Sequence, residues 1–146
     1  MEAVPGTYAE IERIWQPGDV VTVDMPMDVT LVEGHPRIEE LRNQVAIKRG
    51  PLVYCIESPD LPEGTRILDV YLRGKTDLQV NHRPDFLGGV STIAGEVLLR
   101  CDDGEGMYRT VKQPTWRSCE TTFVPYFAWS NRGTSEMTVF VPVIWE

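Results

Sequence analysis

Short runs in which apolar and polar residues alternate, separated by turn residues, recur along the chain of 146 residues. In "EMTVFVPVIW" (136–145) every second residue from Met137 to Trp145 is apolar, and alternate side chains of a strand share one face. Phe140 and Ile144 are apolar on the other face, which is typical of a strand covered on both sides. About nine or ten such runs, with almost no helical periodicity, predict an all-β protein: an antiparallel β-sandwich of jelly-roll type.

One segment, "HPRIEELRNQ" (35–44), has a helical pattern. Pro36 suits the first position of a helix, where a backbone N–H would have no intrahelical partner. Ile38 and Leu41 lie three residues apart and would share a face. The sequence therefore predicts at most one short helix, near 36–43.

Two alternating runs near the start of the chain flank a proline-glycine turn. "TYAEIERIW" (7–15) and "VVTVDMPM" (20–27) are joined by "QPGD" (16–19), which predicts a β-hairpin. A hairpin without sheet neighbours exposes the edges of its ladder. We therefore expect it to dock on the main sandwich or to pair with another copy of the chain.

Two stretches in the second half of the chain differ in clarity. "VSTIAGEVLLR" (90–100) reads as a strand, and Gly95 in its middle predicts a bulge. Residues 101–118 carry no clear pattern, and their order is left open by the sequence.

Composition and charge exclude several classes of function. Apolar residues make up 42% and charged residues 25% of the chain, as in a soluble globular protein. The net charge of −8 argues against binding nucleic acid or an anionic membrane, because both need a basic face. No apolar run approaches the roughly 18 residues of a membrane span, and no signal-peptide pattern opens the sequence.

The cysteines and histidines do not form a metal or nucleophile motif. Cys55, Cys101 and Cys119 are far apart, which predicts no disulfide framework. Zinc sites usually combine four closely spaced ligands, and His35 and His82 lie near no cysteine. Cys55 alternates within an apolar strand and is expected to be a buried, inert thiol, although a cysteine-histidine pair formed across space stays open.

Carboxylates are abundant but carry no clear signal. Glycoside hydrolysis uses two carboxylates about 5 to 10 Å apart, and among 22 acidic residues some pair meets that distance by chance. Glu10 and Glu12 share the polar face of a run and are expected to be solvated. Asp102, Asp103 and Glu105 could ligate calcium, but their spacing is not that of an EF-hand loop, so a solvated turn is expected.

The aromatic residues leave two interpretations open. Large aromatics dominate the cores of sandwiches, and Trp129 and Trp145 lie in runs that alternate as core residues do. Sugar-binding modules instead stack sugar rings on exposed aromatics, and Trp116 lies in the loop-like segment "KQPTWRS" (112–118). The candidate glycan or interface contacts are Trp116, Tyr126, Trp129 and Arg132.

Three segments resemble glycoside hydrolase family 127, whose founding activity is β-L-arabinofuranosidase. They are "YAEIERIWQPGDVVTVDMPM" (8–27), "NQVAIKRGPLVYCIE" (43–57) and "FVPYFAWSNRGTSEMTVFVP" (123–142). Their most specific pieces are "WQPGD", "RGPLVYC" and "PYFAWSNRG". The resemblance spans most of residues 8–145, is weakest at 101–118, and is to the C-terminal part of the family's proteins.

The resemblance implies that catalysis belongs to another part of such proteins. In the family, a helical (α/α)6 barrel precedes these segments and carries a cysteine nucleophile and a zinc ion held by cysteines and a glutamate. That motif is absent from this sequence, and Cys55 lies in "RGPLVYC", outside it. The resemblance therefore implies no catalytic, cofactor or metal residue in this chain, with zinc expected only in the missing barrel.

The resemblance also implies a domain division and a role. Residues 1–27 would be the last hairpin of the family's middle β-sandwich, and residues 28–146 its C-terminal β-sandwich. The chain would be a fragment, a non-catalytic module that supports the catalytic barrel and contributes to a homodimer. In "SNRG" (130–133), Asn131 and Gly133 would tolerate positive φ, and Arg132 would hold the loop by a charged hydrogen bond.

Two other functions stay open. A carbohydrate-binding module for arabinose-containing plant glycans needs at least two exposed aromatics with parallel rings, and it fails if all four tryptophans are buried. A self-contained enzyme would need a cysteine or a carboxylate pair with a strongly shifted pKa in a cleft.

Overall fold

The computed structural model describes residues 4–101 and 106–145, and they contain β-strands and single 3-10 turns but no α-helix. The all-β prediction is therefore confirmed. The strands are β1 (Val29–Glu33), β2 (Gln44–Arg49), β3 (Leu52–Glu57), β4 (Val70–Arg73), β5 (Gln79–Arg83), β6 (Val90–Arg100), β7 (Trp116–Pro125), β8 (Met137–Thr138) and β9 (Phe140–Ile144). The 3-10 turns are η1 (Glu39–Leu41), η2 (Ser58–Asp60), η3 (Ile67–Asp69) and η4 (Tyr126–Ala128).

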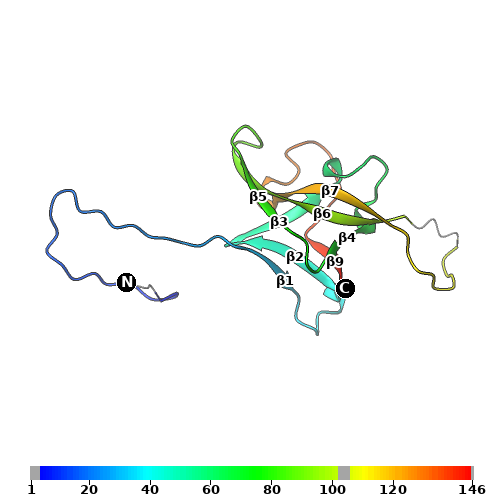
Figure 1. Ribbon diagram of the computed structural model, residues 1–146, viewed down its shortest axis with the longest axis horizontal. Helices are drawn as coiled ribbons and strands as arrows, with labels where there is room; N and C mark the ends of the chain where they lie inside the picture. The colour runs from blue at the N-terminus through cyan, green and yellow to red at the C-terminus, as the bar shows by residue number, and fades with distance from the viewer. Residues whose placement is uncertain (1–3, 102–105, 146) are drawn as a thin grey trace.

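Six of these strands close into a barrel (Figure 1). The strand order runs β2-β9-β4-β6-β7-β3, and β3 pairs with β2 again. Strands β1, β5 and β8 extend the sheet outside this ring by pairing with β2, β6 and β3. The sandwich and jelly-roll detail is thus not confirmed, since one sheet curls on itself instead of two sheets stacking.

Two pairings that alternation cannot predict cause the closure. Strand β3 pairs with β2 at its start, where Leu52 lies opposite Arg49, and with β7 further on, where Tyr54 lies opposite Pro125. Strand β9 runs parallel to β4, with Leu72 of β4 opposite Val143 of β9. Alternation specifies which face of a strand is buried but leaves its neighbours unspecified, so sandwich and barrel predict the same pattern.

Apolar side chains from the ring strands and the 3-10 turns fill the barrel. Tyr54 is fully buried, and its hydroxyl donates a hydrogen bond of 2.9 Å to the carbonyl oxygen of Ser91. That bond satisfies the one polar atom of a large core ring. The buried core consists of Val45, Ile47, Tyr54, Ile56, Leu61, Ile67, Val70, Leu72, Ile93, Val97, Leu99, Phe123 and Val141.

Gly95 does not form the predicted bulge. It lies opposite Thr121 in an unbroken ladder between β6 and β7. Leu78 packs directly over its Cα, and a Cβ at this position would approach the Leu78 Cδ2 to 2.7 Å. The glycine therefore provides room for a neighbouring side chain, which is the other common reason for glycine inside a strand.

The predicted short helix near 36–43 is a single 3-10 turn, Glu39–Leu41. Asn43, with φ of 56°, ends it, and β2 begins one residue later. Three further 3-10 turns lie elsewhere in the described residues and were not predicted. None of the helical segments in residues 4–101 and 106–145 is long and apolar enough to cross a membrane.

The segment from residue 4 to residue 28 is an extended arm, and the predicted hairpin at 7–27 is wrong as secondary structure. The turn at its tip does form, because Asp19 N–H donates to the Gln16 carbonyl at 3.1 Å and its carboxylate accepts from the Gln16 N–H. The flanking runs form no ladder with each other. A two-stranded hairpin is marginal without further strands or a packed face.

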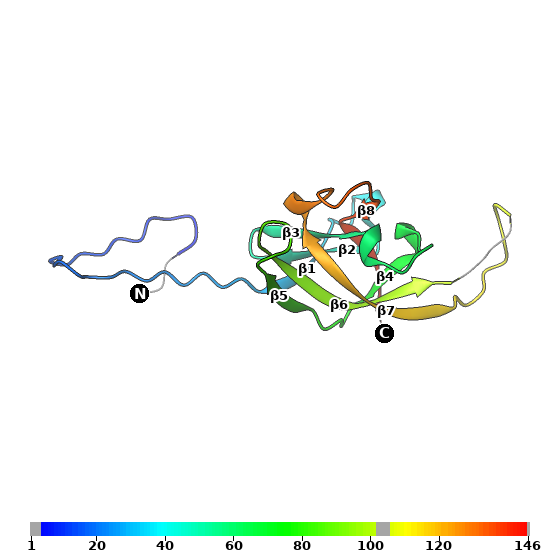
Figure 2. The ribbon, with the colours of Figure 1, turned by 90° about the horizontal axis from the view of Figure 1, so that it is seen from above.

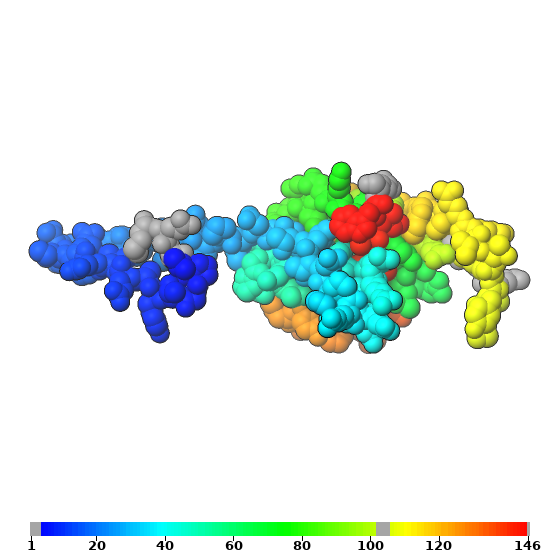
Figure 3. Space-filling model, turned by 90° about the horizontal axis from the view of Figure 1, so that it is seen from below, coloured from blue at the N-terminus to red at the C-terminus, as the bar shows by residue number. Residues whose placement is uncertain are grey.

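The arm leads away from the barrel instead of docking on it (Figures 1 and 2). Figure 3 shows it in blue, opposite the yellow segment that leads into β7. Tyr8 is 98% and Ile14 is 89% exposed. Of the two expected alternatives, docking on the barrel is therefore not seen, and pairing with another copy stays a prediction.

Candidate functional site

Strand β7 ends in a turn that presents aromatic side chains (the orange segment after β7 in Figure 2). Pro125 is the last residue of the strand and lacks an N–H for a further ladder bond. Ala128 is buried and anchors the turn, while Tyr126, Phe127 and Trp129 are 48%, 66% and 39% exposed. We call these three exposed residues the aromatic turn.

Two rings of the aromatic turn are nearly parallel. The Tyr126 and Trp129 rings make an angle of 14°, and their centroids lie 6.3 Å apart. The two residues are three apart in a 3-10 turn, a spacing that places side chains over one another. The Trp129 N–H donates to the Tyr126 carbonyl at 3.2 Å, which closes the turn.

The chain after the aromatic turn is held by its own polar groups. The Asn131 amide nitrogen donates to the carbonyls of Ala128 at 3.1 Å and Trp129 at 3.4 Å. Positive φ occurs at Ser130 (65°) and at Gly133 (100°). The prediction for Gly133 is confirmed, whereas Ser130 rather than Asn131 adopts the left-handed conformation.

Arg132 connects this segment to two carboxylates, of which Glu57 is fully buried. Its Nη1 donates to Asp60 Oδ1 at 2.8 Å, and its Nη2 donates to both Glu57 Oε2 and Asp60 Oδ2. Glu57 closes β3 and is fully buried, and Asp60 lies in η2. The three side chains form the ion cluster, in which one guanidinium faces two carboxylates, a strong and directional arrangement.

Glu57 also binds the segment that follows the aromatic turn. Its Oε1 accepts from the Ser130 N–H at 3.2 Å and from the Ser135 hydroxyl at 2.9 Å. Burial raises the pKa of Glu57, but the hydrogen bonds from Arg132, Ser130 and Ser135 outweigh it, so that the pKa lies below its ordinary value. The hydrogen bond to Asp60 raises the pKa of Arg132 above its ordinary value. Both groups therefore stay charged at neutral pH.

Sequence reasoning missed Glu57 and Asp60 as part of this site. A signal did exist, since Glu57 ends the apolar run "LVYCIE" (52–57), and a buried carboxylate needs a cationic partner. Arg132, 75 residues further along, is that partner. The sequence alone does not specify which arginine fills the role.

Phe86 extends the same surface. The Arg83 guanidinium carbon lies 4.1 Å and that of Arg132 5.4 Å from the Phe86 ring centroid. Both are within the range of cation–π attraction. The turn after β5 is thereby joined to the ion cluster.

Trp116 is placed differently from the prediction. It is the first residue of β7, paired with Arg100, and not part of a loop. Its ring packs edge-on against Tyr71, with centroids 4.9 Å apart and an angle of 71°. The aromatic turn follows the other end of this ten-residue strand, roughly 30 Å away. Of the four candidate residues, Tyr126, Trp129 and Arg132 therefore come together and Trp116 does not.

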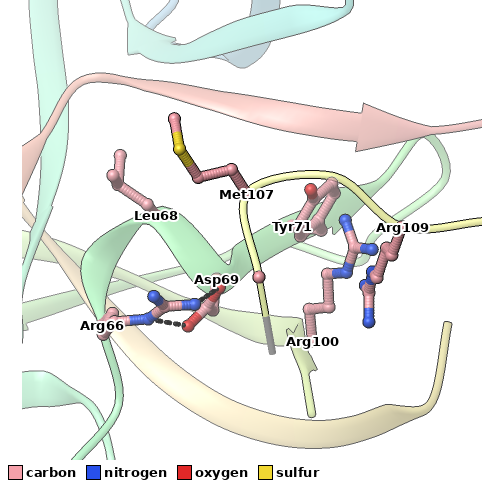
Figure 4. A pocket seen from close by; sticks show the side chains of 8 residues that line it. Arg66, Leu68, Asp69, Tyr71, Arg100, Met107 and Arg109 are labelled. Carbon is pink, nitrogen blue, oxygen red and sulfur yellow. Dashed lines mark hydrogen bonds and ion pairs between the residues drawn. The ribbon is translucent and has the colours of Figure 1, made fainter. Parts of the chain in front are cut away.

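A cavity lies near Trp116 (Figure 4). It has a volume of about 300 Å³ and is lined by Arg66, Leu68, Asp69, Tyr71, Arg100, Gly106, Met107 and Arg109. Arg66 and Asp69 neutralise each other through hydrogen bonds of 2.6 and 2.8 Å, and Arg100 and Arg109 have partners of their own. The acidic residues Asp102, Asp103 and Glu105, considered above for calcium, lie outside the described residues.

The cysteines fit neither a nucleophile nor a zinc site. All three are free thiols. Burial, and then the charge of Glu57, raise the pKa of Cys55 to about 12, so that it stays protonated. Among residues 4–101 and 106–145, no three histidine, cysteine or carboxylate side chains gather closely enough to hold a metal ion. The described residues therefore provide no set of ligands for zinc. The expectation that zinc belongs to the missing barrel stays a prediction.

The sequence that forms this barrel matches the C-terminal domain of a class of glycoside hydrolases. The family model of the glycoside hydrolase family 127 C-terminal domain matches residues 29–142. The chain therefore belongs to glycoside hydrolase family 127.

Relatives of known name agree with this family. A curated non-reducing end β-L-arabinofuranosidase of Bifidobacterium longum is 34% identical over 128 residues, which cover 82% of this chain and 19% of the relative. The solved structure of Ara127N, a family 127 β-L-arabinofuranosidase of Geobacillus stearothermophilus T6, is 32% identical, with a TM-score of 0.74 over 82% of this chain and 19% of that one. A solved glycoside hydrolase is 39% identical, with a TM-score of 0.86 over 98% of this chain and 24% of the other. The chain thus spans about a fifth of the length of these named relatives.

Proposed function

We propose that this chain is a non-catalytic module of a family 127 glycoside hydrolase, one that supports the catalytic part of its parent protein. The parent would be a hydrolase of β-L-arabinofuranosidase type, because the named relatives carry that activity in chains about five times longer. The match of the C-terminal family model supports the position of the module within such a protein.

The observation that carries the proposal is the burial and pairing of the carboxylates and of the Cys55 thiol in the barrel. The carboxylates of Glu57 and Asp60 share one guanidinium, and Glu57 is sealed from solvent. A general acid needs a raised pKa and access to its substrate, whereas the pKa of Glu57 is lowered. The Cys55 thiol stays protonated and buried. These groups hold the fold instead of performing acid–base or nucleophilic chemistry.

The arm supports the proposal that the chain is a module attached to further parts of a longer protein. The C-terminal family model begins at residue 29, so residues 1–27 lie before it. Every described residue from 4 to 26 is exposed, including apolar ones such as Val23. We propose that these residues belong to a neighbouring β-sandwich of the parent protein and that the module also contributes to a homodimer.

The test is a turnover assay on the purified chain. With p-nitrophenyl β-L-arabinofuranoside as substrate, we expect no release of nitrophenol above the uncatalysed rate. Turnover that persists through purification and is abolished by Cys55→Ala or Glu57→Gln would overturn the proposal. Turnover unaffected by both variants would point to a contaminating enzyme, and a catalytically active relative serves as the positive control.

A further inference from the structure

We propose that the aromatic turn is a binding site for a neutral saccharide. The outer face of the stacked Tyr126–Trp129 pair would pack against the C–H face of a sugar ring, and Phe127 would extend the contact. The inference goes beyond the supporting role proposed above and does not depend on the substrate of the parent.

The exposed rings have the arrangement that sugar stacking needs. A furanose or pyranose ring has one apolar face of C–H groups, which packs on an aromatic face without needing a charged partner. Tyr126 and Trp129 present nearly parallel rings, 14° apart, and both remain substantially exposed. Trp116 packs against Tyr71, whereas Trp129 remains partly exposed to solvent.

The size of the surface favours a sugar over a protein partner. An aromatic side chain has about 150–250 Å² of surface, so the exposed fractions leave roughly 300 Å² on the three rings. A stable protein interface needs about 800 Å² on each partner. The aromatic turn alone covers less than half of that, but it matches one or two sugar rings.

The chain segment that carries the aromatic turn favours a neutral ligand. Residues 121–131 contain no charged side chain. Arg132, the next residue, is neutralised by Glu57 and Asp60 and is largely withdrawn from solvent. No free charge in this segment would attract a phosphate or a carboxylate, whereas sugar hydroxyls need only neutral polar groups. Asn131 and Ser130 beside the rings are exposed and provide them.

The aromatic turn is also rigid before any ligand binds. Ala128 is buried beneath it, the Ser130 N–H is held by Glu57, and Asn131 holds two carbonyls of the turn. Binding therefore costs little ordering of the protein, and preorganisation of this kind increases affinity. A loose apolar loop would lose much of a weak stacking energy to that cost.

Calorimetric titration of the full chain with short oligosaccharides tests the site. The probes are L-arabinofuranose, xylose and glucose oligomers, each up to millimolar concentration. We expect saturable binding of at least one of them, weakened at least tenfold by Trp129→Ala and by Phe127→Ala. Phe127 is 66% exposed, so its variant keeps the fold even if the Trp129 variant does not. Trp145→Ala, which removes an exposed tryptophan outside the aromatic turn, is the control and should bind normally.

Two results would overturn the proposal. The first is a failure of the aromatic turn to bind sugar. It would be seen as the absence of saturable heat with every probe, or as binding that Phe127→Ala and Trp129→Ala leave unchanged. The second is self-association in sedimentation that these two variants abolish, which would make the aromatic turn a protein interface instead. Neither result bears on the turnover assay, so the two proposals fail independently.

Discussion

At the scale of single residues, Glu57 has the largest influence on the site. It is fully buried, yet it serves as hydrogen-bond acceptor for Arg132, Ser130 and Ser135. A buried carboxylate with several donors is stabilised in its charged form. One side chain therefore joins the end of β3 to the aromatic turn and to the segment that follows it.

This arrangement predicts an acid sensitivity. Because the pKa of Glu57 is lowered in the folded state, its contribution to stability is present above the ordinary glutamate pKa of about 4.3 and is lost as the pH falls through the lower folded value. Glu57→Gln should cost about 2–3 kcal/mol at pH 7, since Arg132 keeps Asp60 as a partner. It should also flatten the loss of stability below about pH 4.3.

Urea unfolding of both proteins at several pH values between about 2 and 7 measures these effects. Glu63→Gln removes an exposed carboxylate of the neighbouring loop and serves as the matched control. Parallel pH curves for the wild type and Glu57→Gln would show that the carboxylate does not carry the linkage.

At the scale of elements, closure of the barrel depends on the parallel pair β4–β9. Just beyond β4, the Gly74 N–H donates to the Ile144 carbonyl at 2.9 Å, and the Trp145 indole lies directly over the Gly74 Cα. A Cβ on Gly74 would overlap the indole. A glycine that sequence reasoning did not single out thus permits the close approach at the seam of the barrel.

Gly74→Ala should therefore destabilise the barrel by about 1–3 kcal/mol, as overpacking does. Trp145 is exposed and can be removed at low cost, so Trp145→Ala should relieve the overlap and restore most of the loss in the double variant. Thermal unfolding of the two single variants and the double variant completes the cycle. Additive effects of the two substitutions would contradict the proposed contact.

At the scale of the whole molecule, a closed barrel is joined to an open arm. Met27, near the base of the arm, lies against Gly50, but residues 4–26 bury nothing on the barrel. Exposed apolar segments with unpaired backbone tend to associate. Stability and association should therefore reside in different parts of the chain.

Deletion of residues 1–25 should leave the unfolding midpoint of the barrel unchanged and should remove association of the chain with itself. Sedimentation at increasing concentration, together with thermal unfolding, measures both quantities. A full-length chain that stays monomeric would contradict pairing between arms. A midpoint that falls on deletion would show that the arm packs on the barrel in solution.

Much of the candidate site was accessible from local sequence, but not its supports. Tyr126, Trp129 and Arg132 stand within seven residues of one motif, so their proximity needs no tertiary information. Glu57 and Asp60 meet Arg132 from 75 and 72 residues away in the sequence. Trp116 was expected in a loop, yet it starts the strand after which Trp129 lies.

The sequence by itself determined the all-β class and the family, because alternation with a period of two is a local property and the three motifs are continuous in the chain. Only the tertiary structure decided between sandwich and barrel, left the 7–27 segment as an arm, and paired Arg132 with Glu57. The physical reason is common to all three: each depends on which distant partner a segment meets. Alternating polarity specifies a buried face, but it does not specify that partner.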